Sequence, residues 1–475
     1  MCTLHLRSLG SKSSRLDSDR SRLSLPLPPP PRPGQVSVTT AMSAALRRIQ
    51  LGNALSAFGN GFTVPYLFLY VARVRDLGAG TAGIVLAVFA VAALMVLPFT
   101  GRIIDRRGPL PVVLVGSVAA AAGSAGMGLA STEVLVIAAA ALLGTGISVI
   151  QPALATLIVW CSSPSTRSRA FATQFFLANL GLGIGGLLGG LIVDVSRAAS
   201  FVLLFGIEAV MFLVLGATVA SVRPAKAAGA ESGSGESVPA DGGGNGWRAL
   251  LRDRSMMSLC VLGFVMFFAC YGQFESGLSA FAVDVARISP ATLGVALAAN
   301  TAVIVLAQFV VLRLVERRRR SRVIALVGLI WTLAWVAAGA SGLVHGHHAV
   351  AVAAIISTYA LFGLGEAMLS PTMAPLVADL APRELIGRYN SAFALVKQLA
   401  LAAGPAVGGL MAGAGAYTAY IAMLIVCSLA ISVLALRLGR RLSPEQDSPL
   451  RAAARPVMAV AGTEATAPAP VAVGA

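Results

Sequence analysis

Four ionisable side chains lie inside long apolar stretches of this sequence: Glu208, Glu275, Glu366 and Lys397. A charge at the centre of a hydrocarbon layer costs about 2.5 to 3.5 kcal/mol unless it faces water or a partner. A desolvated carboxyl group can bind a proton in one conformation and release it in another. These residue types in this setting therefore indicate proton binding linked to a conformational change.

The four groups are not equivalent. Glu275, two residues after Gln273 in the outer half of its apolar stretch, is the first candidate for proton coupling. Glu366 and Lys397 lie in consecutive stretches, so we expect them to pair across adjacent helices, either as a structural ion pair or as part of a substrate or gate site. Glu208 is expected either to form an internal hydrogen bond or to lie near the outer interface.

A second group of charges occupies residues 101–108, which read Gly-Arg-Ile-Ile-Asp-Arg-Arg-Gly between two apolar runs. We interpret this segment as a short hairpin at a membrane interface, and its arginines favour the cytoplasmic side. The order of charges returns in the second half, where three residues repeat three of the first: Arg313, Glu316 and Arg317 for Arg102, Asp105 and Arg106. This duplication predicts two homologous halves.

The elements that carry these residues are membrane-spanning helices. Of the 475 residues, 57% are hydrophobic and only 12% are charged, which excludes an ordinary soluble domain. The net charge of +16 lies between apolar runs rather than on one soluble face, so no nucleic-acid partner is expected. We count twelve spans of about 20 residues, each long enough for a helix to cross a bilayer. The seventh span is expected at residues 256–281.

The predicted fold is all-α and integral to the membrane, with two pseudo-symmetric six-helix bundles. The bundles are placed at residues 47–222 and 256–441, joined by a cytoplasmic linker at residues 223–255. Disordered tails are expected at residues 1–46 and 442–475, and translation starts at either Met1 or Met42. The loops assigned to the outside hold only four basic residues, Arg73, Arg75, Arg197 and Arg287, so both termini are expected in the cytoplasm.

A second internal repeat supports the two halves. Gly144-x-Gly146 with Pro152 matches Gly363-x-Gly365 with Pro371. The same spacing pairs Arg169 with Arg388, Gly185 with Gly404, and Gly189-Gly190 with Gly408-Gly409. Spans four and five therefore correspond to spans ten and eleven.

Residues 101–108, together with the repeats, resemble the loop between helices two and three of the major facilitator superfamily of secondary transporters. The resemblance covers roughly residues 47–441 and implies alternating access between two rocking halves. It implies that Asp105 docks on the amino end of helix eleven, near residues 386–389, and latches a cytoplasmic gate. The gating residues would be Gly101, Asp105, Arg106, Gly108, Glu316, Arg317 and Arg388. The alternative is plain positive-inside anchoring with glycines at turn positions.

The resemblance also implies that spans one, four, seven and ten line a central cavity. The candidates for substrate contact are then Asn60, Gln151, Gln273 and Tyr271, with Glu366 beside them. A cavity with few charges suits an amphipathic or lipophilic compound.

Glycines at four-residue spacing predict close helix packing in span five, at Gly181, Gly185 and Gly189. Drug and metabolite antiporters of the superfamily resemble Gly-x-x-x-Gly-Pro-x-x-Gly-Gly at this place. Here Gly186 replaces the proline, whereas span eleven carries the proline form with Gly404, Pro405 and Gly408. Many proton-coupled exporters also have an arginine at the position that Ala140 occupies in this chain. The alanine departs from the pattern of a proton relay through span four.

We expect a bacterial plasma-membrane transporter that acts as a monomer and exports small amphipathic or lipophilic molecules, with protons as the coupling partner. The alternatives are a proton-coupled importer of a small metabolite and a membrane sensor that keeps the fold without transport. No enzyme motif is present and no cofactor is expected. His345, His347 and His348 share one loop without a carboxylate, so no metal site is expected.

Overall fold

The structure is a computed structural model that describes residues 33–222, 245–274, 276–344 and 346–453. The chain divides into two units, residues 1–41 and 42–475. Of the first unit only the beginning of α1, from Pro33, is described, and all contacts reported below lie within the second unit. The described residues form helices and no strands, and twelve helical segments are long and apolar enough to cross a membrane. The predicted fold class is confirmed.

The first half contains the elements α1 (Pro33–Thr63), η2 (Val64–Tyr66), α2 (Leu67–Leu69), η3 (Tyr70–Val74), α3 (Gly78–Arg107), α4 (Pro109–Leu129), α5 (Glu133–Trp160), α6 (Arg167–Ile192) and α7 (Ala198–Ala220). The second half contains α8 (Asn245–Arg252), α9 (Arg254–Ala269), η4 (Tyr271–Gln273), α10 (Gly277–Asp284), α11 (Pro290–Val315), α12 (Arg320–Leu343), α13 (His348–Leu369), α14 (Met373–Leu380), η5 (Arg383–Leu385), α15 (Ile386–Gly413), α16 (Tyr417–Gly439), α17 (Pro444–Asp447) and α18 (Pro449–Ala453).

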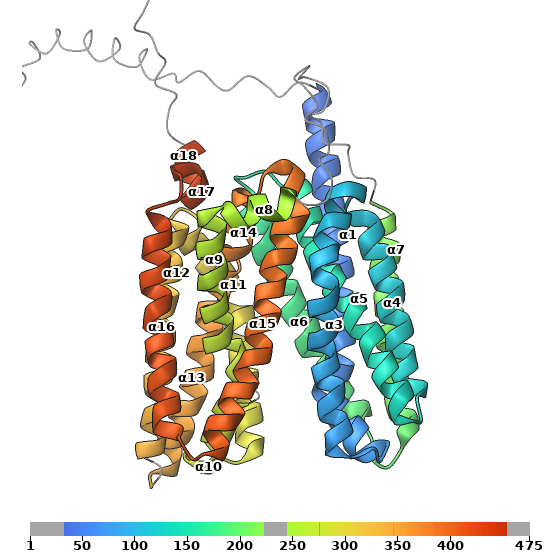
Figure 1. Ribbon diagram of the computed structural model, residues 1–475, viewed down its shortest axis with the longest axis vertical. Helices are drawn as coiled ribbons and strands as arrows, with labels where there is room; N and C mark the ends of the chain where they lie inside the picture. Colours follow the sequence, from blue (N-terminus) through green and yellow to red (C-terminus); the bar gives the residue numbers. More distant parts are fainter. Residues whose placement is uncertain (1–32, 223–244, 275, 345, 454–475) are drawn as a thin grey trace, which may run out of the picture. The chain divides into compact units, whose positions relative to one another are not determined.

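Each half packs mainly on itself. In the first half α4 packs on α5 and α7, and α3 packs on α5; in the second half α12 packs on α13 and α16, and α11 packs on α13. The two halves meet where α3 packs on α15 and α6 packs on α11. Figure 1 shows α3 and α15 coming together beside α8, between the two groups of helices.

The glycines of the sequence repeat occupy equivalent places. A Cβ atom at Gly144 would lie 3.1 Å from the backbone of α3, and one at its counterpart Gly363 would lie 2.6 Å from the backbone of α11. Gly185 packs on the backbone of α1, and its counterpart Gly404 packs on the backbone of η4. Because corresponding glycines contact corresponding helices, the offset found in the sequence reflects a structural repeat.

Span seven departs from the prediction. The continuous helix expected at residues 256–281 is instead broken into α9, η4 and α10. The break is stabilised by side chains from outside α9, because Trp335 Nε1 donates to Ala269 O at 3.0 Å and Gln273 Nε2 donates to Phe268 O at 2.9 Å. Side-chain bonds of this kind satisfy backbone groups that a broken helix leaves free inside a membrane.

The charged segment at residues 101–108 is not a hairpin, because α3 continues through it to Arg107. The turn consists of Gly108, whose φ of 82° favours glycine, and α4 begins directly afterwards at Pro109. Gly101 therefore lies inside a helix.

Helices also occupy parts of the chain that the sequence predicted as tails and linker. Helix α1 begins at Pro33, and α8 occupies residues that were assigned to the linker. After residue 441, Ser443 caps α17 in a capping box. Asp447 Oδ1 then accepts from Ser321 N at 2.8 Å, which ties this segment to the start of α12. Polar caps and one buried aspartate, rather than an apolar run, order this segment, so hydropathy does not reveal it.

Candidate functional site

The first candidate contact joins the end of α3 to the start of α15. Asp105 Oδ1 accepts a hydrogen bond from Gly387 N at 2.7 Å, and Asp105 Oδ2 lies 3.6 Å from Arg388 Nε. The Asp105 and Arg388 side chains are only 7% and 9% exposed. A carboxylate here also meets the positive end of the α15 dipole. The docking expected from the sequence is therefore present.

Two glycines allow this approach. A Cβ atom at Gly101 would lie 2.7 Å from Arg388 Cα, and one at Gly387 would lie 2.6 Å from Asp105 Oδ1. Neither place has room for a side chain while α3 and α15 are in contact. Gly101 was expected at a turn, but its observed role is helix contact.

Helix α8 and the start of α9 cover this contact. Gly246 of α8 lies against the guanidinium of Arg388 without space for a Cβ atom. Tyr389 Oη donates to Asp253 Oδ2 at 2.9 Å, and Asp253 caps α9 by accepting from Ser255 N and Met256 N. The end of the linker is thus part of the same structure.

Glu316, the counterpart of Asp105 in the second half, forms a second contact between the halves. Arg169 of α6 donates to Glu316 through Nε at 2.8 Å and through Nη2 at 2.9 Å. The Arg169 hydrogen bond, together with the nearby arginines, lowers the pKa of Glu316 below its ordinary value. In the first pair the acid lies on the first half and the arginine on the second, and in this pair the order is reversed.

A third cross-half contact was missed by the sequence interpretation. Asp379 of α14 pairs through Oδ1 with Arg167 of α6, and Arg320 Nη1 of α12 donates to Asp379 Oδ2 at 2.6 Å. Arg320 also donates to Gln446 O at 2.9 Å. Each of these three charges follows or begins an apolar run, which could have indicated an interfacial contact. None of them belongs to the repeated motif, so the repeat did not point to them.

The remaining gate candidates make fewer contacts. Arg106 and Arg317 are exposed, and no hydrogen bond or ion pair of their side chains is found in the part of the chain that the structure describes. Arg317 adds to the positive charge around Glu316. Their position at helix ends suits membrane anchoring.

The predicted pair of Glu366 and Lys397 does not form. Glu366 is 4% exposed and accepts from Asn300 Nδ2 at 3.0 Å, whereas Lys397 Nζ lies 5.5 Å from the ring centroid of Phe267. No ion pair joins the two among the described residues. The reason is packing, since α13 packs on α11 and α12 while α15 packs on α3 and α9. Spans ten and eleven are consecutive in the sequence, but α13 and α15 pack mainly on other helices.

The cavity candidates divide into accessible and buried groups. Gln151 and Lys397 are exposed in the middle of their helices, Asn60 and Tyr271 are half-buried, and Gln273 is fully buried. The Gln273 amide bonds Phe268 O and accepts from Tyr420 Oη at 2.9 Å. The prediction that Gln273 contacts substrate is wrong for this conformation, because its polar atoms support the helix break.

Two further predictions concern single carboxyl groups. Glu275 lies outside the described residues. Glu208 is 1% exposed and accepts from Thr63 Oγ1 at 2.8 Å and from Ser124 Oγ at 2.5 Å, so the internal hydrogen bond is the correct alternative.

The glycine candidates are packing sites. Gly181, Gly185 and Gly189 of α6 all face α1, where Cβ atoms would approach the backbone at Ala54, Phe58 and Phe62. Gly404 and Gly408 of α15 face η4 and the start of α10 in the same way, and Pro405 lies inside α15 between them.

The sequence profile of the Major Facilitator Superfamily matches residues 49–360 and 286–471 of this chain. The two matches together cover far more than half of the sequence. The chain belongs to the Major Facilitator Superfamily.

Several relatives of this superfamily member are transporters. It is 26% identical over 385 residues to the uncharacterized MFS-type transporter YdeE of Escherichia coli K12, covering 78% of this chain and 90% of that protein. It is 24% identical over 367 residues to the uncharacterized MFS-type transporter YqjV of Bacillus subtilis 168, covering 76% and 85%. Over 127 residues it is 32% identical to the multidrug resistance protein MdtH of Shigella boydii, covering 27% and 31%.

Solved structures of the superfamily share the fold. The human organic anion transporter MFSD10 superposes with a TM-score of 0.62 at 18% identity, covering 85% of this chain and 99% of that one. The MFS transporter FucP in its outward conformation superposes with a TM-score of 0.67 at 14% identity, covering 84% and 99%. The family match makes this chain a multi-pass secondary transporter, and the three ion-pair contacts described above lie where its halves meet.

Proposed function

We propose that this transporter exports small amphipathic or lipophilic molecules across the cytoplasmic membrane in exchange for protons. The observation that carries the proposal is a buried carboxyl group, Glu366, that has no cation within ion-pair distance among the described residues. Its partner is the neutral amide of Asn300, 3.0 Å away. An unpaired charge in such a place is costly, so Glu366 is our first candidate among the described residues for binding the coupling proton.

In this proposal, the contacts between the halves form a gate that closes one side of the transporter. The contacts of Asp105, Glu316 and Asp379 all join the halves at the same ends of the helices, and arginines are concentrated there. Arginine-rich helix ends favour the cytoplasmic side. A transporter closed at that side is poised to release a substrate outward and to admit protons.

Proton coupling then needs a path between Glu366 and the accessible interior. Tyr271 and Phe267 lie between α13 and Lys397, with ring centroids 5.4 Å apart, and Tyr271 also packs on Trp331. Lys397 is exposed and is held over an aromatic face rather than by a carboxylate. Rocking of α15 would change the separation of Lys397 from Glu366 and so the cost of ionising the carboxyl group.

The side chains around Lys397 support the proposed substrate class. Around Lys397, the exposed charge on α15, the described neighbours are aromatic: Lys397 Nζ lies 5.5 Å from the ring centroid of Phe267, which packs on Tyr271. An apolar surface with few polar groups favours amphipathic or lipophilic compounds. The multidrug resistance protein MdtH, related over 127 residues, supports the same class by analogy.

The test is uptake of a fluorescent lipophilic cation into inverted membrane vesicles from expressing cells, driven by an imposed proton gradient. We expect wild type to accumulate the dye, Glu366→Gln to lose gradient-dependent uptake, and Glu208→Gln to retain it. Glu208 is the matched control because it is also buried and hydrogen-bonded, but it lies in the first half.

Glu275→Gln is measured in parallel, because the sequence gives that residue the same role. Loss of uptake in Glu275→Gln alone would move the coupling site to span seven. Absence of gradient-driven uptake in wild type, with the protein present in the membrane, would contradict export and favour the import alternative. Ala140 in place of the exporters' arginine agrees with that alternative.

A further inference from the structure

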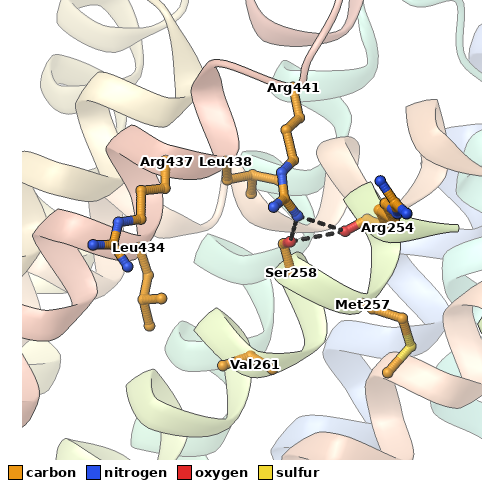
Figure 2. A pocket seen from close by; sticks show the side chains of 8 residues that line it. All are labelled: Arg254, Met257, Ser258, Val261, Leu434, Arg437, Leu438 and Arg441. Carbon is orange, nitrogen blue, oxygen red and sulfur yellow. Dashed lines mark hydrogen bonds between the residues drawn. The ribbon is translucent and has the colours of Figure 1, made fainter.

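A groove of about 420 Å³ lies between the first turns of α9 and the last turns of α16. These two helices pack on each other within the second half, whereas the contacts between the halves are made mainly by α3, α5, α6, α11, α14 and α15. The residues that line the groove lie on α9 and at the end of α16, and none of them is on the helices that join the halves. Figure 2 shows the eight side chains that line it.

The mouth of the groove is strongly basic. Arg254, Arg437 and Arg441 are all exposed and line the same groove, and the eight lining residues include no carboxylate. Figure 2 shows Arg441 reaching from α16 toward the first turn of α9, with Arg437 and Arg254 on either side of it. Three like charges in one place repel one another unless an anion lies among them.

Only one of the three guanidinium groups is engaged. Arg441 Nη1 donates to Ser258 Oγ at 2.6 Å and to Arg254 O at 3.4 Å. A guanidinium has five N–H donors, so Arg441 retains donors for a ligand. In the part of the chain that the structure describes, the Arg254 and Arg437 side chains form no hydrogen bond or ion pair.

The floor of the groove is apolar. Met257 and Val261 follow Arg254 along α9, and Leu434 precedes Arg437 by one turn of α16. Both helices are long and apolar enough to cross a membrane, and Val261 is 51% exposed. A surface that is cationic at the helix ends and apolar one to two turns further along has the two-part chemistry of a phospholipid.

We propose that this groove binds a phospholipid with an anionic headgroup, such as phosphatidylglycerol or cardiolipin. Its phosphate lies among Arg254, Arg437 and Arg441, and an acyl chain lies along Met257 and Val261. Basic pockets between helices at the cytoplasmic surface are suited to such headgroups. A soluble phosphate would use the arginines but would leave the apolar floor uncovered. The proposal does not depend on the direction or coupling of transport.

The experiment uses the purified full-length chain in detergent micelles. Native mass spectrometry measures the retained lipid while dioleoyl phosphatidylglycerol is titrated, with dioleoyl phosphatidylcholine as the zwitterionic comparison. We expect one lipid bound preferentially from the anionic series. The double variant Arg254→Gln, Arg437→Gln should raise the half-saturating concentration by roughly fivefold for each arginine removed, about 25-fold together.

Two further variants make the test specific. Val261→Trp keeps all three arginines but fills the apolar floor, so it should also weaken retention of the lipid. Arg322→Gln removes an exposed arginine from the first turn of α12, outside the groove, and should bind as wild type does.

The proposal fails if phosphatidylcholine is retained as well as phosphatidylglycerol, or if the double variant binds like wild type. Normal binding by Val261→Trp, together with displacement of the lipid by glycerol phosphate, would show a soluble phosphate site instead. Size-exclusion chromatography checks that each variant is folded. If the double variant aggregates, Val261→Trp and the single variant Arg437→Gln decide the outcome.

Discussion

At the scale of single residues, the proposed gate depends on two positions that have no side chain. Gly101 and Gly387 let the backbones of α3 and α15 meet, and that contact brings Asp105 to the first N–H groups of α15. While α3 and α15 are in contact, there is no space for a methyl group at either glycine. Adding a methyl group at either position is therefore expected to destabilise the closed state alone.

We predict that Gly101→Ala opens the gate. The new Cβ atom would lie 2.7 Å from Arg388 Cα, and overpacking of this kind costs about 1 to 3 kcal/mol. The measurement is the labelling rate of Ser370→Cys in a cysteine-free background, because Ser370 bonds Phe171 O across the halves. A membrane-impermeant maleimide should react roughly 5-fold to 100-fold faster. Gly83→Ala in the same helix has free space and is the control; equal rates in both variants would contradict the prediction.

Asp379 offers a test of charge rather than volume. It is 9% exposed in its side chain and lies between Arg167 and Arg320. Asp379→Asn leaves two guanidinium groups without their counter-charge, and breaking a buried pair costs about 3 kcal/mol or more. We expect faster labelling of Ser370→Cys, and Asp379→Glu should restore most of the protection. Asp194→Asn changes a half-buried aspartate in another loop, whose side chain bonds its neighbour Ser196, and should change nothing. Labelling of Asp379→Asn at the wild-type rate would remove this triad from the gate.

The Arg169–Glu316 contact predicts a pH dependence. Because the folded-state pKa of Glu316 is lowered, its ion pair stabilises the folded state above the ordinary glutamate pKa and is lost as the pH falls through the lowered value. The melting temperatures of wild type and Glu316→Gln should differ by a constant amount between pH 8 and pH 5, and the difference should shrink below about pH 4. Arg169 is 65% exposed, so the effect is about 1 kcal/mol or less. A difference that grows on acidification would contradict this assignment.

At the scale of elements, the central question is how a continuous apolar run becomes a broken helix. The run at residues 256–281 contains nothing that forbids a helix, and hydropathy gives no sign of the break. The break depends on Trp335 and Tyr420, which lie on α12 and α16 and reach the free groups at Ala269 and Gln273. Local pattern predicts where a span lies, but partners distant in the sequence decide whether it stays continuous.

Tyr420→Phe tests this account. Tyr420 is 1% exposed and its Oη donates to Gln273 Oε1 at 2.9 Å, so the variant leaves a buried amide oxygen without its donor. We expect a loss of about 1 to 2 kcal/mol and a lower melting temperature in detergent. Tyr417→Phe removes a hydroxyl that bonds Asp284 at an exposed place and should lower the melting temperature much less. Equal melting temperatures for the two variants would show that the break does not need this bond.

At the scale of the whole molecule, the repeat was the most informative part of the sequence. The offset between Gly144 and Gly363 predicted which helices correspond, and the glycine contacts agree with it. Interior pairing could not be predicted in the same way. Glu366 and Lys397 lie in consecutive spans, yet their helices pack on different neighbours. Sequence order gives the spans, whereas helix packing decides which side chains meet.

The repeat also makes a prediction about the gate as one unit. The Asp105 contact joins α3 to α15, the Glu316 contact joins α11 to α6, and the two share no residue. If the halves move as rigid bodies, both contacts break in the same step, so their contributions to the closed state add. The double variant Asp105→Asn, Glu316→Gln should therefore increase the labelling rate of Ser370→Cys by the product of the two single effects.

Asp284→Asn is the control for that experiment, because Asp284 ends α10 and bonds Tyr417 rather than the opposite half. Combined with either gate variant, it should leave the labelling rate unchanged. A double gate variant that labels no faster than the stronger single variant would mean that one contact alone holds the gate. The contact removed by the weaker single variant would then carry no part of closure, although the two contacts occupy corresponding places in the sequence repeat.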